Sequence, residues 1–443
     1  MSRESDWLRE ARISRAQFFR MMGGLAVAAA APAALSACST QQNTGATAGA
    51  GGDAATALKF IGVADQKAPM DELVAAYRKV KPGVTITTSF APTDQVQTSV
   101  RTQLGAGNAP DLHVVYPGNG SAMSMTQIAQ AGLLADLSAQ AWTTTIPSGF
   151  KPAFQLDGKT YMFSAGSSVI GAIYNKKVFE EAGVGELPTT WSEFLAACEK
   201  IKKSGKPPIA LGAQTPWVTQ LITYALVPST VYAKDPAFDD KQLAGQATFA
   251  GSGWRQAMEM YLELHKRGYF NDNPNGTTFE QQTSMVATGK AGMAIQVSAV
   301  LPDFRKAAAG DAADLSMFPV PGADDAAQVW IPAGVVVGLG ASAKSGNLAE
   351  ATAFIDFLGR QESINAWAKA IAAIPLTQDS GSTIDPAVES FLPFTKDRAV
   401  PFMDQRWPNA EVQPTHFAVI QELLAGKSTI DEALKKMDEA YQK

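Results

Sequence analysis

The feature that most constrains the fold is a regular alternation of strand-like and helix-like segments that begins at residue 58. Short β-branched and aromatic runs predict strands, and apolar residues three and four apart predict helices. Strands are expected at 58–63, 84–90 and 109–116, and helices at 69–81 and 94–104. This order predicts an α/β fold in which right-handed crossovers build a parallel sheet.

In a parallel sheet of this kind, small ligands bind beyond the carboxyl ends of the strands. Residues 64–66 follow the first expected strand, and residues 116–121 follow the third. These two loops carry Asp65, Gln66, Tyr116 and Asn119. We therefore expect one rim of the sheet to face a ligand.

A second informative stretch, residues 158–179, changes character in its middle. An apolar run at 161–163 and a β-branched strand at 169–174 are joined by the small polar residues 164–168. Such a link is either a tight loop within one sheet or the point where the chain leaves one lobe for another. The length of 443 residues favours the second interpretation, because single cores stop growing at roughly 250–300 residues.

Composition narrows the class of protein. A hydrophobic content of 46% and a charged content of 18% are typical of a globular protein, and the formal net charge of −5 argues against a nucleic-acid partner. The chain has two cysteines, Cys38 and Cys198, so a disulfide framework is excluded. Cys198 falls on the apolar face of an expected helix and is predicted to be a packed thiol.

The N-terminus has the order of features found in a bacterial lipoprotein signal peptide. Several arginines precede the apolar run 21–34, which ends in Leu35-Ser-Ala-Cys38, a sequence that resembles the lipobox. We therefore expect residues 1–38 to form the signal and lipobox, with Cys38 lipidated. The Gly- and Ala-rich residues 39–57 would then be a flexible tether to the outer face of the cytoplasmic membrane.

The export route stays open between the general secretion and twin-arginine systems. Residues 14–20 resemble the twin-arginine motif, but Ala16 stands in the place of the second arginine.

Six short segments follow one another in the rest of the chain. They are LGAGNAPDL (104–112), AGLLADL (131–137), IYNKKVFEEAG (173–183), PTTWSEF (188–194), GKAGMAI (289–295) and AEATAFIDFL (349–358). In this order, together with the lipobox, they resemble the extracellular solute-binding proteins of ABC importers, specifically the carbohydrate-binding, maltose-binding-protein-like family.

The resemblance implies two α/β lobes joined by three hinge crossings, which close on a ligand. The crossings are expected near 163–168, 317–321 and 374–376. Lobe 1 would comprise residues 58–163 and 320–373, and lobe 2 residues 164–319 and 374–443. A hinge of this kind opens and closes at modest cost, and the ligand shifts the balance between the two states.

The resemblance also implies a sugar site between the lobes. Sugars need polar side chains at the ring edge and flat aromatic rings against the ring faces. Asp65, Gln66, Tyr116, Asn119 and Ser168 match ligand positions of the family, although Ser168 stands where the family has a carboxylate.

The stacking residue is harder to assign from the sequence. The family commonly has a tryptophan just after the Gly-Met-Ala strand, and residues 296–299 contain none. We expect stacking from tryptophans that lie beside prolines in loop-like contexts, which are Trp217, Trp330 and Trp407. Trp191, Trp254 and Trp367 lie at helical core spacing and are interpreted as packing residues.

No signature of catalysis occurs in the chain. A nucleophile elbow, a phosphate loop and a zinc-protease motif are all lacking, so no enzyme activity, metal or cofactor is expected. The predicted function is a monomeric, lipid-anchored subunit that captures a mono- or oligosaccharide for an ABC permease with a separate ATPase. The alternatives are a binding protein for another polar solute, such as a glycerol phosphate or a polyamine, and a lipid-anchored polysaccharide-degrading enzyme.

Overall fold

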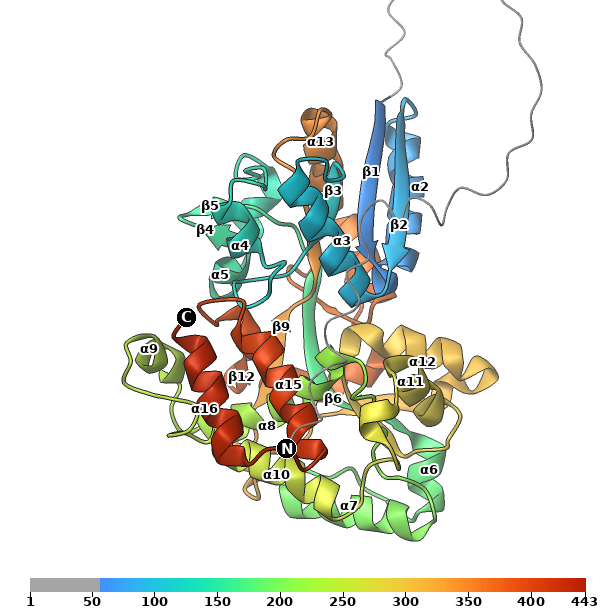
Figure 1. The fold of residues 1–443 in the computed structure, drawn as a ribbon. Helices are drawn as coiled ribbons and strands as arrows, with labels where there is room; N and C mark the ends of the chain where they lie inside the picture. Colours follow the sequence, from blue (N-terminus) through green and yellow to red (C-terminus); the bar gives the residue numbers. More distant parts are fainter. Residues whose placement is uncertain (1–55) are drawn as a thin grey trace, which may run out of the picture. The chain divides into compact units, whose positions relative to one another are not determined.

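The computed structural model describes residues 56–443, apart from the side chains of residues 309 and 311. Its first part alternates strands and helices in the predicted order (Figure 1), as β1 (Thr56–Val63), α2 (Lys67–Val80), β2 (Val84–Ala91), α3 (Thr93–Ala106) and β3 (Leu112–Val115). The predicted α/β fold is therefore confirmed. Signal, lipobox and tether all precede the described residues, except for the last two tether positions.

The first sheet has the strand order β10-β3-β1-β2, where β10 is Gly338–Ala341. β1 pairs in parallel with β2 from Thr56↔Val84 to Val63↔Ala91, and β3 is also parallel to β1. Because these strands are parallel, the segments that follow β1 and β3 leave the same edge of the sheet. The short 3-10 helix η1 (Ala64–Gln66) and Tyr116 begin at that edge.

The remaining elements around the first sheet are helical, apart from one hairpin. They are α4 (Met125–Gln130), α5 (Lys151–Phe154), β4 (Gln155–Leu156), β5 (Lys159–Thr160), α13 (Leu348–Leu358) and α14 (Gln361–Ala370).

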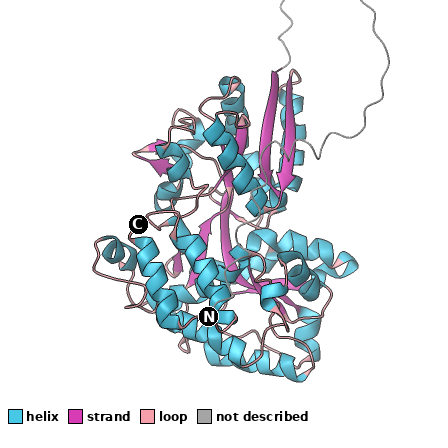
Figure 2. Cartoon of the chain, in the orientation of Figure 1, coloured by secondary structure: helices cyan, strands magenta, loops and turns pink. Residues whose placement is uncertain are grey.

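The second sheet is built around β6 (Gly166–Asn175), every residue of which is buried. Its strand order is β11-β6-β9-β12, and β7 and β8 also pair with β6. The partner strands are β7 (Met293–Val297), β8 (Leu315–Phe318), β9 (Ile331–Val335), β11 (Ile374–Pro375) and β12 (Ala399–Val400). In Figure 2 these strands lie among helices.

Nine α-helices of the described residues belong to this part of the chain. They are α6 (Lys176–Glu181), α7 (Trp191–Lys203), α8 (Gln220–Val227), α9 (Phe238–Leu243), α10 (Trp254–Lys266), α11 (Phe279–Ala287), α12 (Leu301–Ala307), α15 (Val412–Leu424) and α16 (Ile430–Tyr441). Among residues 56–443, no helix combines the length and apolarity needed to cross a bilayer.

The buried apolar side chains form separate cores around the two sheets. One cluster covers the first sheet with residues from Leu58 to Ala165 and from Val335 to Ala373. The second sheet has a cluster on each face, because successive side chains of a strand point to opposite sides. Ile170 and Ala172 of β6 belong to one of these clusters, and Val169 and Ile173 belong to the other.

The chain passes between the two cores at three places. Ala165 belongs to the core of the first sheet and Val169 to that of the second, so one passage lies close to the predicted crossing at 163–168. Another lies at 373–374, where Ala373 and Ile374 pack in different cores. The bounds predicted for the lobes remain a prediction. Below, lobe 1 and lobe 2 denote the parts that pack around the first and second sheets.

The remaining passage differs from the prediction. Met317 lies in β8, which pairs with β6, and Val320 packs in the core of the second sheet. The chain instead changes core within β9, between Ile331 and Val335. The prolines near 319–321 suggested a break in structure, but the apolar run before them completes the second sheet.

Candidate ligand-binding site

Asp65 lies at the carboxyl edge of the first sheet, in η1 directly after β1. Its side chain is partly exposed, yet its Oδ1 atom is buried and has no hydrogen-bond partner within residues 56–443. Burial raises the pKa of Asp65 to about 6, and the carboxylate of Asp303 in α12 adds to this rise. An unpartnered buried acceptor is costly unless something donates to it, so Asp65 has the chemistry of a ligand-binding group.

Tyr116 follows β3 at the same edge and is half-buried. Its backbone N–H donates to the carbonyl of Met123 at 2.9 Å, which fixes the start of the loop. Burial raises the pKa of Tyr116, and the charges of Asp65 and Asp94 raise it further. The structure therefore places Tyr116 close to Asp65, as expected for two side chains at neighbouring strand ends.

Gln66 is 3% exposed, and its amide is engaged within the protein. Its Nε2 donates to the carbonyls of Val337 and Gly338, each at 3.3 Å, and its Oε1 accepts from the N–H of Val63 at 3.2 Å. These bonds join η1 to β10. Gln66 thus stabilises the sheet and has no group directed at a ligand.

Ser168 is 2% exposed inside β6. Its hydroxyl lies 2.9 Å from the Ser298 hydroxyl and accepts from the N–H of Ala299 at 3.2 Å. These bonds join β6 to the segment that follows β7, so the predicted ligand contact of Ser168 is replaced by a structural one.

Asn119 has both ends of its amide in hydrogen bonds. Its Nδ2 donates to the carbonyl of Pro408 at 2.6 Å, and its Oδ1 accepts from Gln127 at 2.7 Å. The neighbouring Gly120 donates its N–H to the carbonyl of Asp404 at 2.8 Å, and a Cβ at this glycine would lie 2.2 Å from that same oxygen. Asn119 therefore fixes the loop against residues 404–408.

Trp217 provides an accessible aromatic ring in lobe 2. It lies in the short turn before α8 and is only partly buried, with its ring 5.1 Å from that of Phe279 in α11. The N–H of Phe279 donates to the Thr215 hydroxyl at 3.0 Å, which holds the turn against α11. The ring centroid of Phe279 in turn lies 6.4 Å from that of Phe304, which follows Asp303 in α12. One run of contacts therefore links the Trp217 ring to α12, the helix whose Asp303 contributes to the raised pKa of Asp65.

Trp330, just before β9, is partly buried against the second core. Its backbone N–H donates to the Ser229 hydroxyl at 3.0 Å, and its backbone carbonyl accepts from the same hydroxyl at 3.3 Å. Its ring is accessible, but these contacts do not bring it to Asp65 or Tyr116.

Trp407 is 2% exposed, and its burial contradicts the prediction that it stacks on a ligand. Its ring lies 6.0–6.3 Å from four other rings, those of Tyr224, Phe249, Trp254 and His416. The flanking proline suggested an open loop, but this segment packs into the core between α8, α10 and α15. Trp254 and Trp367 are buried as predicted, and so is the thiol of Cys198.

Asp303 and Phe279 are the site residues that the sequence did not reveal. Asp303 stands in the first turn of α12, a few residues after the carboxyl end of β7. The rule that ligands bind beyond strand ends could have singled it out. The family resemblance points there only to a tryptophan, which residues 296–299 lack.

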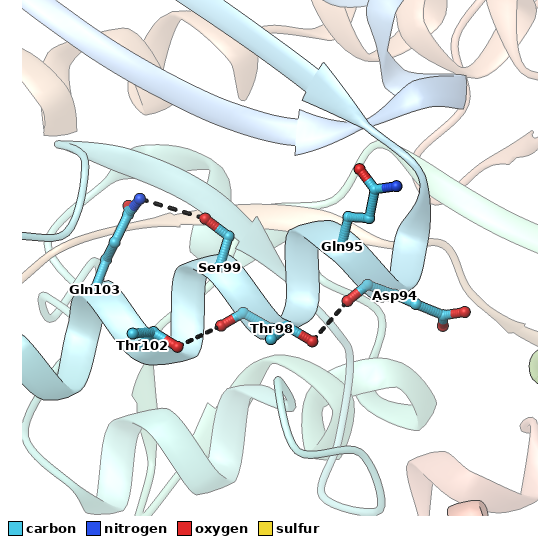
Figure 3. Close-up of a pocket in the computed structure, with 6 residues that line it drawn as sticks. All are labelled: Asp94, Gln95, Thr98, Ser99, Thr102 and Gln103. Atoms are coloured by element: carbon cyan, nitrogen blue, oxygen red, sulfur yellow. Dashed lines mark hydrogen bonds between the residues drawn. The ribbon is translucent and has the colours of Figure 1, made fainter. Parts of the chain in front are cut away.

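A depression lined by polar residues lies along α3 (Figure 3). It has a volume of about 560 Å³ and is lined by Asp94, Gln95, Thr98, Ser99, Thr102 and Gln103. The hydroxyls of Thr98 and Thr102 donate to carbonyls of their own helix, each at 2.8 Å. Their oxygen lone pairs and the free end of Gln95 are left to contact solvent. No group of three or more metal-ligating side chains occurs in the part of the chain that the structure describes.

The family model of bacterial extracellular solute-binding proteins matches residues 63–364, which is well over half of the chain. The chain belongs to this family. The match includes η1, the loop after β3, Trp217 and α12, so the candidate site of this solute-binding protein lies within the family region.

Curated relatives are similar at low identity. The "Multiple sugar-binding protein" of Streptococcus mutans is 22% identical over 353 residues, which cover 77% of this chain and 81% of the relative. A "Probable sugar-binding periplasmic protein" of Rhizobium meliloti is 27% identical over 235 residues, or 52% of this chain and 54% of the relative. The similarity thus spans about half the length of the second relative.

Solved structures share the fold. A chitin oligosaccharide binding protein superposes with a TM-score of 0.76 at 21% identity and covers 88% of this chain and 98% of its own. A solute-binding protein in complex with raffinose gives a TM-score of 0.72 at 17% identity, with 87% and 98% covered. These neighbours are binding proteins of two lobes, and their identity is low enough that they show the fold alone.

A pH-dependent effect on stability follows from the burial of the Asp65 carboxylate. Its folded-state pKa lies above the ordinary value of 3.8, so ionisation disfavours the folded state. We expect Asp65→Asn to raise the melting temperature of the ligand-free protein above pH 7, and the gain to vanish below pH 4. Melting curves of both proteins between pH 4 and pH 8 measure this difference.

The matched control is Asp157→Asn, because Asp157 is exposed in the turn between β4 and β5. It should leave the curve unchanged at every pH. Equal pH profiles of wild type and Asp65→Asn would show that a partner in the protein already satisfies this carboxylate.

Proposed function

We propose that this solute-binding protein captures a mono- or oligosaccharide between its lobes and delivers it unmodified to the permease of an ABC importer. The observation that carries the proposal is that the two lobes each supply one of the two kinds of group that a sugar needs. Asp65 and Tyr116 supply a free acceptor and a phenol on lobe 1, and Trp217 supplies a flat ring on lobe 2. Sugars require this combination, since their edges are hydroxyl groups and their faces are C–H groups.

The names of similar proteins support a carbohydrate ligand. They include sugar-binding proteins and structures in complex with raffinose and stachyose. One structural neighbour is described as an ABC transporter solute-binding protein bound to tagatose. These relatives support capture and transport of a sugar by this chain, with a permease as partner.

The same proposal includes lipidation at Cys38, a tether to the membrane and a monomeric state. Each of these rests on the N-terminal sequence pattern or on the family resemblance. Treatment of cells with labelled palmitate tests the anchor, because label should enter the wild type and be lost in Cys38→Ala.

A glycosidase is the second candidate, and one observation favours it. The carboxylate of Asp303 in lobe 2 contributes to the raised pKa of Asp65 in lobe 1, and glycoside hydrolysis uses two facing carboxylates. The relatives are binding proteins, which supports capture without cleavage.

A thermal-shift screen of mono- and oligosaccharides tests the proposal. A ligand that binds only the folded state stabilises it by about 2.7 kcal/mol at 100 times its Kd. We expect at least one sugar to raise the melting temperature in a concentration-dependent way. If glycerol phosphates or polyamines raise the melting temperature and no sugar does, the protein binds another class of solute.

A further inference from the structure

Three buried polar side chains of lobe 2 have hydrogen-bonding atoms without partners. Gln296 of β7 is 0% exposed, and Gln282 and Thr283 of α11 are 1% and 5% exposed. Both amide atoms of Gln296, the Nε2 of Gln282 and the Oγ1 of Thr283 have no hydrogen-bond partner among residues 56–443. Burying such groups is costly unless something donates to them or accepts from them. Below, the amide cluster denotes these three residues.

Two parallel strands separate at the amide cluster. Ile209 pairs in parallel with Met293 of β7, and the N–H of Ala210 donates to the carbonyl of Met293 at 2.8 Å. In a regular parallel ladder, the N–H of Gly212 would donate to β7 in the same way. It donates instead to the Oε1 atom of Gln282 at 3.0 Å. The Gln282 amide therefore lies where the two strands part, towards the carboxyl end of β7.

The side chain of Gln296 points to the face of the sheet that α11 covers. Ala294 of β7 packs in the same apolar core as Val286 of α11. Side chains two positions apart in a strand share a face, so Gln296 lies on the same face as Ala294. Residues four apart on a helix also share a face, which places Gln282 beside Val286. The two glutamines therefore meet between α11 and the end of β7.

The proposed stacking ring is close to the amide cluster. Phe279 stands one turn before Gln282 in α11, and its ring lies 5.1 Å from that of Trp217. The turn that carries Trp217 begins just after Gly212, the residue that donates to Gln282. Trp217 and Phe279 are both partly exposed. A ligand that stacks on Trp217 is therefore close to unpartnered polar atoms behind the two rings.

We propose that the amide cluster binds the hydroxymethyl group of a hexose unit that stacks on Trp217, and so selects hexoses over pentoses and 6-deoxy sugars. This inference rests on the proposed sugar-binding function and names its substrate class. A hydroxyl group both donates and accepts, so it can donate to the Oε1 of Gln296 and accept from the Nε2 of Gln282. The hydroxymethyl group carries its oxygen one bond beyond the ring edge, which lets it reach behind the stacked ring. Its entry requires the partly exposed side chain of Phe279 to change rotamer.

Sugars that differ only in the hydroxymethyl group test the proposal by titration calorimetry. The parent sugars are glucose, galactose, mannose and cellotriose. The matched analogues are 6-deoxyglucose, 6-deoxygalactose, 6-deoxymannose and xylotriose. For each parent that binds, we expect the analogue to bind more weakly by about tenfold or more, because the buried amides then stay unpaired.

Gln296→Met should reduce this preference to about twofold or less, as expected for groups that do not interact. Its melting temperature should equal or exceed that of the wild type, since the variant removes an unpaired buried amide. Gln242→Met is the matched control, because Gln242 is also buried with both amide atoms unpartnered among residues 56–443. It lies in α9, on the other side of lobe 2 from α11 (Figure 1), and its variant should keep the wild-type preference.

Wild-type protein that binds an analogue as tightly as its parent would overturn the selection of hexoses while keeping the sugar-binding function. An undiminished preference in Gln296→Met would also overturn it, and is the result expected if the amide cluster holds only a structural water. If no sugar binds, either in calorimetry or in the thermal-shift screen, the proposed function itself is overturned.

Discussion

Trp407→Ala is expected to lower the free energy of unfolding by about 3–5 kcal/mol, as is usual when a buried tryptophan is truncated. The indole of Trp407 fills a space between four other rings, and little relaxation is open to that packed cluster. The same segment also supports lobe 1, because the carbonyls of Asp404 and Pro408 accept hydrogen bonds from Gly120 and Asn119. Urea unfolding followed by circular dichroism measures the loss.

The folded fraction of Trp407→Ala should still bind the sugar with an affinity near that of the wild type. Trp330→Ala is the matched control, because Trp330 is also a tryptophan of lobe 2 but is only partly buried. It should cost markedly less stability. If Trp407→Ala instead keeps the wild-type free energy of unfolding and no longer binds the sugar, Trp407 belongs to the binding site.

Trp217→Ala is expected to weaken sugar binding by about 1–3 kcal/mol, or roughly 5- to 150-fold in Kd, if its ring stacks on the sugar face. The ring is partly exposed and is held from behind by Phe279, so a ligand can reach its open face. Because Trp217 is not enclosed in the core, its loss should affect stability far less than that of Trp407. Calorimetric titration of the sugar found in the thermal-shift screen measures the change.

Trp217→Phe should recover most of the affinity, since it keeps an aromatic face at the same position. Trp330→Ala serves again as the control and should bind almost as tightly as the wild type. Equal affinities for wild type and Trp217→Ala would place the stacking ring elsewhere in lobe 2.

The strand ends were predictable from sequence because they depend on local patterns. Alternating apolar runs located β1, β2 and β3, and the rule for parallel sheets then brought Asp65 and Tyr116 to one edge. The small polar link before β6 similarly indicated a passage between two cores. These inferences require only the order of elements along the chain.

The hydrogen-bond partners and the burial of individual side chains were not predictable in this way. Gln66 and Ser168 stand where the family binds ligands, yet the Gln66 amide nitrogen and the Ser168 hydroxyl bond to residues more than 100 positions away along the chain. The burial of Trp407 likewise depends on distant elements, because α8, α10 and α15 supply the rings that surround it. The position of Asp303 soon after β7 could be read from the sequence, but its effect on the pKa of Asp65 depends on the fold.

Equilibrium dialysis followed by mass spectrometry of the recovered sugar tests the central claim most directly. We predict that a neutral oligosaccharide is retained at one molecule per protein chain and is recovered with its mass unaltered after prolonged incubation. Failure to retain any neutral sugar, or recovery of shorter products, would contradict a protein that holds its ligand between two walls and releases it intact.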